Sequence, residues 1–270
     1  MQTYLNSSKF KKFIPDWITT VVLILLFFIV LEKGNPFPRE FQVNDPRISH
    51  PFAEQERVTD NELYIYSTLL PLVIISLISL YLPSSRFDKL HLLQVSLLGL
   101  LFCVTITCCI TDILKCWISN PRPDFLVRCG ATGAVVRSES MSEKVLMSMT
   151  KCSAPLGQMY LLDGMKSTPS GHSSMSFAGL GYLSLWLVGQ LRLLNEKKLQ
   201  YLFVWGVVVG APILFAAWIA LTRTQDYRHH FVDIVIGAIL GSAFALASYF
   251  KYFNSPWAND CYIPIDYDEY

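Results

Sequence analysis

The chain has 270 residues, of which 52% are hydrophobic and only 16% are charged, and its formal net charge at pH 7 is +1. A typical soluble domain has about 25% charged residues, so this composition indicates an integral membrane protein. A net charge so close to zero gives no electrostatic reason to expect a nucleic-acid partner, and we expect none. The sequence shows no internal repeat, and we expect a single domain over residues 1–270.

Six apolar stretches approach the roughly 20 residues that a helix needs to cross the hydrocarbon core of a bilayer. They cover about residues 14–31, 64–82, 90–114, 172–194, 201–221 and 231–252. The first stretch follows a group of lysines, as the apolar part of a signal peptide would, but no small-residue cleavage site follows it, so we expect a retained span. The predicted fold is an all-α polytopic membrane protein with six transmembrane helices.

The distribution of lysine and arginine predicts the orientation, because cytoplasmic loops are enriched in both. With six spans, the two termini lie on the same side. The N-terminus, the tail and the connections 83–89 and 195–200 (with Arg192) hold nine Lys and Arg in about 45 residues, whereas the other loops hold thirteen in about 100. We therefore expect cytoplasmic N- and C-termini. The loops expected in a lumen or outside the cell are about 32–63, 115–171 and 222–230.

Two of the seven cysteines, Cys129 and Cys152, lie deep in the longest of these outer loops. An oxidising compartment permits a disulfide between them, but sequence alone does not give the geometry, so a disulfide and two free thiols both stay open. No CxxC pair and no Cys/His spacing indicates a zinc site, and we expect no bound metal.

The longest outer loop opens with KCWISNPRPDF, which contains Lys115 and Arg122. Pro121 and Pro123 forbid a regular helix there, so we expect Arg122 on a stiff extended segment, where it suits an anion. The alternative is a lysine that reaches to the membrane surface, followed by a proline pair that ends the helix, with no ligand.

The same loop ends with KSTPSGHSSMSF. We expect Thr168 to cap a helix, Pro169 to take its first position, and Ser170 and Gly171 to offer free backbone N–H groups. A helix N-terminus carries about half a positive charge, so this turn could bind an anion, with His172 beside it. The alternative is an ordinary capped helix with one interfacial histidine.

The third cluster, TRTQDYRHHFVD, begins at Thr222. His229 and Asp233 are four residues apart, and we expect them to share a helix face, where the carboxylate accepts a proton from one ring nitrogen and leaves the other free. Arg223 lies on the preceding turn, and we expect His230 only to pack. The alternative is an ion-pair network without chemistry.

Together the clusters provide three cations, a helix N-terminus and two histidines, all on one membrane face. These groups suit phosphoryl transfer: the cations and amides hold the phosphate oxygens, one histidine attacks phosphorus and the other protonates the departing oxygen. The sequence has no cage of Asp and Glu residues for a metal, so the cations would neutralise the charge that Mg²⁺ neutralises elsewhere.

The three stretches resemble the K-x6-R-P, P-S-G-H and S-R-x5-H-x3-D motifs of the type 2 phosphatidate phosphatase superfamily. Together with NDPRISHPF in the first outer loop, they are most similar to its lipid phosphate phosphatase branch, and there to the fungal diacylglycerol pyrophosphate phosphatases. The one departure is Thr222, where the family usually has Ser.

The resemblance implies a Mg²⁺-independent phosphatase that removes phosphate from diacylglycerol pyrophosphate and phosphatidate through a phosphohistidine. It implies that His229 is the nucleophile, that Asp233 orients it and that His172 is the acid for the leaving group. The implied phosphate-binding residues are Lys115, Arg122, Ser170, Gly171 and Arg223. It implies no metal, no cofactor, a phospholipid substrate within the membrane, and a vacuolar or other endomembrane location.

Other functions remain open from the sequence. The substrate could be another lipid phosphate, such as lysophosphatidate, a sphingoid phosphate or a polyprenyl pyrophosphate. A non-catalytic membrane protein that binds a lipid phosphate is a different class, but such relatives usually lack the nucleophile or the acid. A related soluble branch binds vanadate and oxidises halides, and six spans argue against it. The sequence does not indicate an oligomeric state.

Overall fold

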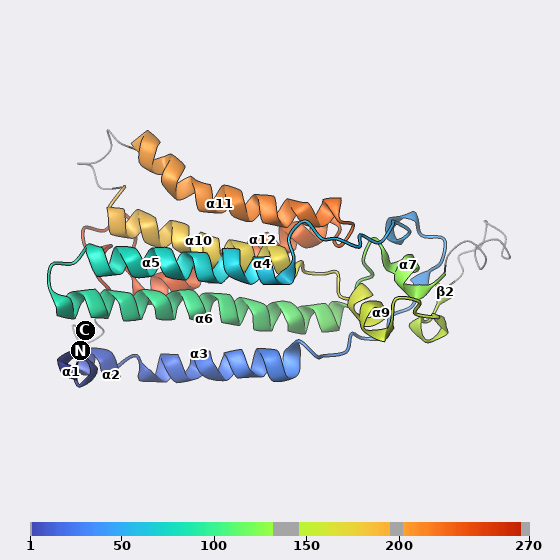
Figure 1. The fold of residues 1–270 in the computed structure, drawn as a ribbon, viewed down its shortest axis with the longest axis horizontal. Helices are drawn as coiled ribbons and strands as arrows, with labels where there is room; N and C mark the ends of the chain where they lie inside the picture. Colours follow the sequence, from blue (N-terminus) through green and yellow to red (C-terminus); the bar gives the residue numbers. More distant parts are fainter. Residues whose placement is uncertain (1, 132–145, 195–201, 266–270) are drawn as a thin grey trace.

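The fold is a bundle of long helices that run side by side, capped at one end by short elements (Figure 1). A computed structural model describes residues 2–131, 146–194 and 202–265. The elements, in chain order, are α1 (Gln2–Leu5), α2 (Ser8–Lys11), α3 (Ile14–Leu26), η1 (Phe27–Leu31), β1 (Phe41–Gln42), η2 (Pro46–Ile48), α4 (Asp60–Tyr64), η3 (Ile65–Leu69), α5 (Leu70–Tyr81), α6 (Arg86–Ile118), α7 (Phe125–Cys129), β2 (Leu146–Met147), η4 (Met149–Lys151), α9 (Gln158–Gly164), α10 (Gly171–Leu191), α11 (Leu202–Gln225) and α12 (Phe231–Tyr252).

Five helical stretches of the described chain are long and apolar enough to cross a membrane. They are Ser8–Leu31, Asp60–Tyr81, Arg86–Ile118, Gly206–Gln225 and Phe231–Tyr252. Each overlaps one of the six predicted spans, because runs of Leu, Ile, Val and Phe favour both a helix and the lipid phase. The predicted connection 195–200 and residue 201 lie outside the described residues.

The remaining predicted span, 172–194, corresponds to α10, which has 21 residues but is not among these five. Its serines, glycines, His172 and Gln190 lower its hydropathy. Most of its side chains are buried, because α10 packs against α6, α11 and α12. A helix that is covered by protein on most sides needs less apolar surface than one that faces lipid, and the count of six spans stays a prediction.

Small residues let α10 and α12 approach closely. A Cβ atom on Gly241 would lie 2.1 Å from the carbonyl oxygen of Ser174, and one on Gly237 would lie 2.6 Å from that of Ser170. Only glycine fits at such contacts, which is the usual way that small residues four apart bring two membrane helices together. The contact holds the beginning of α12 against the beginning of α10.

Local sequence signals determine where α6 begins and where it ends. The Ser85 hydroxyl accepts a hydrogen bond from the N–H of Asp88 (3.0 Å) and caps the start of the helix. At the other end Ser119 adopts the left-handed conformation (φ 48°), and Pro121 and Pro123 prevent further helix. The predicted break is present, but α6 runs to Ile118, so Lys115 belongs to its last turn.

A small cap of short elements lies at one end of the bundle, and α1 and α2 lie at the other (Figure 1). In the cap, β1 pairs antiparallel with β2, a small departure from the predicted all-α fold. Cys129 and Cys152 form a disulfide with a Cα–Cα distance of 4.7 Å, which selects one of the two alternatives left open by the sequence. At the opposite end Lys251 of α12 pairs with Asp16 of α3 (3.0 Å), so the first span begins beside the end of the last.

Candidate active site

A pocket of about 1390 Å³ lies where the bundle meets the cap, between α4, α6, α10 and the segment 52–57. Apolar side chains such as Phe27, Leu63 and Met175 line one part of it. Among the many charged side chains and histidines that also line it are Lys115, Arg122, His172, Arg223, Arg228 and His229. The structure thus gathers residues of all three predicted clusters around one cavity that has both polar and apolar walls.

Lys115 reaches the beginning of α10 from the last turn of α6. Its ammonium lies 3.6 Å from the carboxylate of Asp112, one turn earlier in α6. A Cβ atom on Gly171 would lie 3.0 Å from Nζ of Lys115. The absence of a side chain at Gly171 therefore leaves space for the ammonium beside the helix N-terminus, and both positive ends face the same pocket.

Arg122 is held on a non-helical segment, as predicted. Its N–H donates to the carbonyl of Gly164 (2.8 Å), and its guanidinium donates to the carboxylate of Asp163 (2.7 Å). Arg128 donates to the other oxygen of Asp163 (2.8 Å). Desolvation opposes ionisation of Asp163, but the charges of Arg122 and Arg128 outweigh it and lower its pKa to about 2. A permanent carboxylate therefore fixes the direction of Arg122.

The start of α10 differs in detail from the prediction. The helix begins at Gly171, and Ser170 is its cap, with a hydroxyl that accepts from the N–H of Ser173 (3.4 Å). Thr168 and Pro169 lie before the cap, joined by a cis peptide bond, so the predicted cap at Thr168 and first position at Pro169 are wrong.

Only one of the two backbone N–H groups that were predicted to bind an anion is free to do so. The N–H of Ser170 donates to the carbonyl of Asp233 (3.0 Å), so it is not available to a ligand. The N–H groups of Gly171 and His172 belong to the first helical turn, where no carbonyl one turn earlier can accept from them. Both residues line the pocket, so these two amides are the ones that an anion can reach.

His229 does not share a helix face with Asp233, contrary to expectation. Helix α12 begins at Phe231 and His230 is its cap, so His229 lies outside the helix, after a turn at Tyr227 (φ 52°). Its Nδ1 lies 4.0 Å from the Asp233 carboxylate, beyond hydrogen-bond distance. The four-residue spacing therefore overestimated how closely the two side chains approach.

The carbonyl of Ser167 takes the place predicted for the carboxylate. Nδ1 of His229 donates to it over 2.7 Å, which leaves Nε2 without a proton and free to react. Burial lowers the pKa of His229 well below 6.5, and the charges of Arg122, Arg223 and Lys115 lower it further. His229 is therefore neutral near pH 7.

Asp233 instead holds the segment that carries this carbonyl. Its carboxylate accepts hydrogen bonds from the hydroxyls of Ser167 (2.6 Å) and Thr168 (2.5 Å) and from the N–H of His230 (2.9 Å). It thus fixes both Ser167, which orients His229, and the cap residue that follows His229. His230 has a structural role, as expected, while Ser167 had no signal beyond its place in KSTPSGH.

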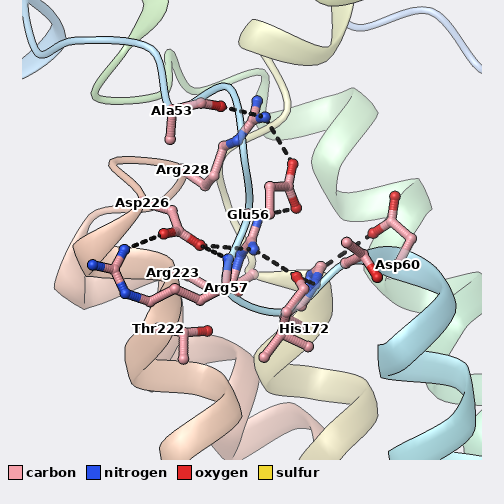
Figure 2. A network of polar contacts seen from close by, with 12 residues as sticks. Ala53, Glu56, Arg57, Asp60, His172, Thr222, Arg223, Asp226 and Arg228 are labelled. Carbon is pink, nitrogen blue, oxygen red and sulfur yellow. Dashed lines mark hydrogen bonds and ion pairs between the residues drawn. The ribbon is translucent and has the colours of Figure 1, made fainter.

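The opposite wall comes from the first outer loop (Figure 2). The carbonyl of Val58 accepts from Nε2 of His172 (2.9 Å) and from Nη1 of Arg223 (3.0 Å). The carboxylate of Glu56 pairs with Arg223 (3.0 Å) and with Arg228 (2.7 Å). Glu56 and Val58 were not predicted, because they are far from the motifs in the sequence and follow no fixed spacing.

Thr222 and Asp226 complete the surroundings of Arg223. The Thr222 hydroxyl donates to the carbonyl of Ile219 (2.7 Å) within its own helix, so it does not point at a ligand. Asp226 is fully buried and pairs with Arg57 (2.6 Å) and Arg223 (3.5 Å). In the described part of the chain, no three His, Cys, Asp or Glu side chains are grouped so that they could hold a metal ion.

Comparisons with known proteins agree with the motifs. The model of the PAP2 superfamily matches residues 96–257. The chain is 43% identical over 244 residues to diacylglycerol pyrophosphate phosphatase 1 of Saccharomyces cerevisiae, covering 89% of this chain and 79% of the yeast protein. It is 33% identical over 263 residues to lipid phosphate phosphatase 2 of Arabidopsis thaliana, covering 93% of this chain and 81% of that protein. No solved structure matches. The chain therefore belongs to the PAP2 superfamily.

Proposed function

We propose that this chain, a lipid phosphate phosphatase of the PAP2 superfamily, removes phosphate from diacylglycerol pyrophosphate and phosphatidate through a phosphohistidine on His229. The observation that carries the proposal is the state of His229: it is buried and neutral, and its Nδ1 donates to Ser167, so Nε2 keeps its lone pair. The names of the relatives support the substrates.

The proposed first step is an attack of His229 Nε2 on the terminal phosphorus. The bond from phosphorus to the bridging oxygen breaks, and that oxygen takes a proton from Nε2 of His172. His172 enters this step as the imidazolium, a form that the negative charge of the bound phosphate favours, and it leaves as the neutral imidazole. Lys115, Arg122, Arg223 and the amide of Gly171 stabilise the charge that spreads over the phosphate oxygens. Ser170 does not line the pocket, its N–H is bonded to Asp233 and its hydroxyl caps α10, so we give it no contact with the phosphate.

The second step is hydrolysis of the phosphohistidine. His172, now without its proton, takes one from a water molecule that attacks phosphorus, and His229 leaves as the neutral imidazole. Throughout both steps Asp233 keeps a negative charge near the ring of His229, which becomes cationic when it carries the phosphoryl group. Phosphate and the dephosphorylated lipid are the products.

The shape of the pocket supports a lipid substrate. Its lysine, arginine and histidine side chains share the cavity with apolar side chains such as Phe27, Leu63 and Met175, so a phosphate can bind among the cations while the acyl chains lie against the apolar side chains. The charge is neutralised by lysine and arginine side chains, so we propose that the reaction needs no Mg²⁺.

We also propose that the termini are cytoplasmic and that the pocket opens to a lumen or to the exterior, at a vacuolar or other endomembrane. The excess of Lys and Arg on the side of the termini supports this orientation. The disulfide between Cys129 and Cys152 also supports it, because disulfides persist in oxidising compartments and are rare in the cytosol.

A phosphate-release panel on the purified protein tests the proposal. The panel contains diacylglycerol pyrophosphate, phosphatidate, lysophosphatidate, a sphingoid phosphate and a polyprenyl pyrophosphate, each with excess EDTA and with His229→Ala as the control. We expect the first two lipids to be hydrolysed fastest and the variant to be inactive. Loss of activity in EDTA that Mg²⁺ restores would contradict the mechanism, and a preference for another lipid would correct the substrate.

A further inference from the structure

Arg228 lies in the pocket, but it occupies a position of the third cluster that the S-R-x5-H-x3-D motif leaves open. Its side chain is 5% exposed and packs on the ring of Phe52, with 4.5 Å from its guanidinium carbon to the ring centroid. Asp124 lies 3.7 Å away, but its two oxygens already accept close hydrogen bonds from Arg128 (2.9 Å each). The near partner of Arg228 is therefore Glu56, at 2.7 Å.

Glu56 joins Arg228 to Arg223, which the superfamily motif assigns to the phosphate. One carboxylate oxygen contacts Arg228 and the other contacts Arg223 (3.0 Å), so the two guanidinium groups face each other across one anion (Figure 2). Two arginines that share one carboxylate have the arrangement of an anion-binding clamp, because guanidinium groups bind carboxylate and phosphate with similar geometry.

The clamp has hydrogen-bonding capacity that Glu56 does not use. The Nε groups of Arg223 and Arg228 are both buried and have no hydrogen-bond partner. A buried donor without a partner costs free energy, and a carboxylate has only two oxygens to offer. A phosphate offers three terminal oxygens and up to two negative charges, so it can satisfy more of these donors than Glu56 does.

Glu56 is also easier to displace than the arginines. Its side chain is 23% exposed, whereas those of Arg223 and Arg228 are 2% and 5% exposed. It belongs to a connection between η2 and α4, and the residue two positions further on, Val58, accepts a hydrogen bond from Nε2 of His172. A movement that withdraws Glu56 would also withdraw this carbonyl and release the nitrogen that the proposed mechanism uses as the acid.

We propose that Arg228 is a further phosphate-binding residue, which clamps the substrate phosphate together with Arg223, and that Glu56 occupies this clamp until the substrate displaces it. This inference rests on the proposed function, since it deepens the account of the same pocket. The substrate phosphate replaces the carboxylate between the two guanidinium groups, and the segment with Val58 moves away from His172. No covalent bond changes in this exchange.

The inference is tested by the binding of inorganic phosphate to the full-length protein in detergent, measured by calorimetry. Glu56→Gln removes the competing charge with little change in size, and we expect phosphate to bind about 10-fold more tightly, equivalent to about 1.4 kcal/mol. Glu54→Gln is the matched control, because it removes the same charge from the same segment of the pocket wall but takes no part in the ion pairs of the clamp. We expect it to change the affinity less than about 2-fold, as is usual for an exposed charge.

Arg228→Gln should weaken phosphate binding by about 10-fold or more, and it should raise the KM for phosphatidate in mixed micelles by a similar factor. Arg47→Gln removes an exposed arginine from the first outer loop and is its control. In the double variant Glu56→Gln/Arg228→Gln, the gain from Glu56→Gln should largely disappear, because the two residues then no longer compete.

Two results would overturn the inference. One is a phosphate affinity in Glu56→Gln that is unchanged or weaker, or no tighter than in Glu54→Gln. The other is an affinity in folded Arg228→Gln equal to that of the wild type. If Arg228→Gln does not fold, Glu56→Gln and its control decide. Phosphate binding needs no turnover, so the two proposals can fail separately. If the wild type and the variants bind phosphate with the expected affinities but the wild type hydrolyses no lipid, the proposed function is contradicted and the clamp is not.

Discussion

Replacing Asp233 by Asn tests how the carboxylate supports His229. The change removes a negative charge 4.0 Å from Nδ1 of a ring that becomes cationic in the covalent intermediate. At an effective dielectric constant of about 20, a unit charge at that distance contributes about 4 kcal/mol. Each 1.36 kcal/mol is about 10-fold in rate, so the upper limit is about 1000-fold, and we expect kcat to fall by about 100-fold to 1000-fold.

The fold should survive this change. Asn keeps one carbonyl oxygen, which can accept from the N–H of His230 and the hydroxyl of Ser167, while its amide can donate to the hydroxyl of Thr168. We expect a loss of stability of about 1.5–3 kcal/mol, the range for one hydrogen bond to a charged group. Thermal unfolding in detergent measures it.

Ser167→Ala is the matched control, because it removes one hydroxyl donor but keeps both the carboxylate and the backbone carbonyl that orients His229. Losing one such hydrogen bond should cost about 10-fold in kcat or less. Steady-state hydrolysis of phosphatidate, with KM measured separately, distinguishes the two variants. A folded Asp233→Asn enzyme with a kcat within about 3-fold of the wild type would refute the electrostatic argument.

The remaining predictions concern protonation and orientation. His172→Ala should slow hydrolysis most for leaving groups that need a proton, and an aryl phosphate with an acidic phenol should recover part of the rate; equal losses on both substrates would contradict its role as the acid. Because the pKa of His229 is lowered below 6.5, the acid limb of kcat/KM should lie below that pH, since this limb reports protonation of the attacking nitrogen. The lowered pKa also makes the stability of the fold depend on pH. The contribution of His229 to the free energy of unfolding is complete above pH 6.5, and it is lost as the pH falls from 6.5 towards the pKa that His229 has in the folded protein. Arg122→Gln removes a positive charge that lowers the pKa of His229, so it should move the acid limb to higher pH. An acid limb above pH 6.5 in the wild type would contradict the lowered pKa. A cysteine introduced at Met159, which is 78% exposed, should react with a membrane-impermeant reagent from the lumenal side only; labelling from the cytosolic side of intact vesicles would reverse the orientation.

The sequence predicted most of the bundle, because the apolar stretches that favour lipid also form the helices. It did not predict how completely α10 is buried inside the bundle, where neighbouring helices rather than lipid cover its polar and small residues. It also placed the His229–Asp233 pair on a helix, although α12 begins two residues after His229. Helix boundaries depend on cap geometry, and an error of one or two residues there changes which side chains meet.

The residues that approach from distant parts of the chain had no signal in the sequence. Glu56 meets Arg223 across 167 positions, and the Ser167 carbonyl meets His229 across 62. A backbone carbonyl has no residue type, so no motif could identify its role. The motif residues, in contrast, could be found because their types and spacing are fixed by the chemistry that they share.

The central claim is that His229 carries the phosphoryl group, and rapid-quench labelling with ³²P-labelled lipid tests it most directly. Wild-type protein should form an acid-labile, base-stable phosphoenzyme before phosphate is released. His229→Ala should form none and should show no turnover, while Asp233→Asn should form it more slowly. A normal yield of acid-labile phosphoenzyme from His229→Ala would contradict the assignment of His229 as the nucleophile.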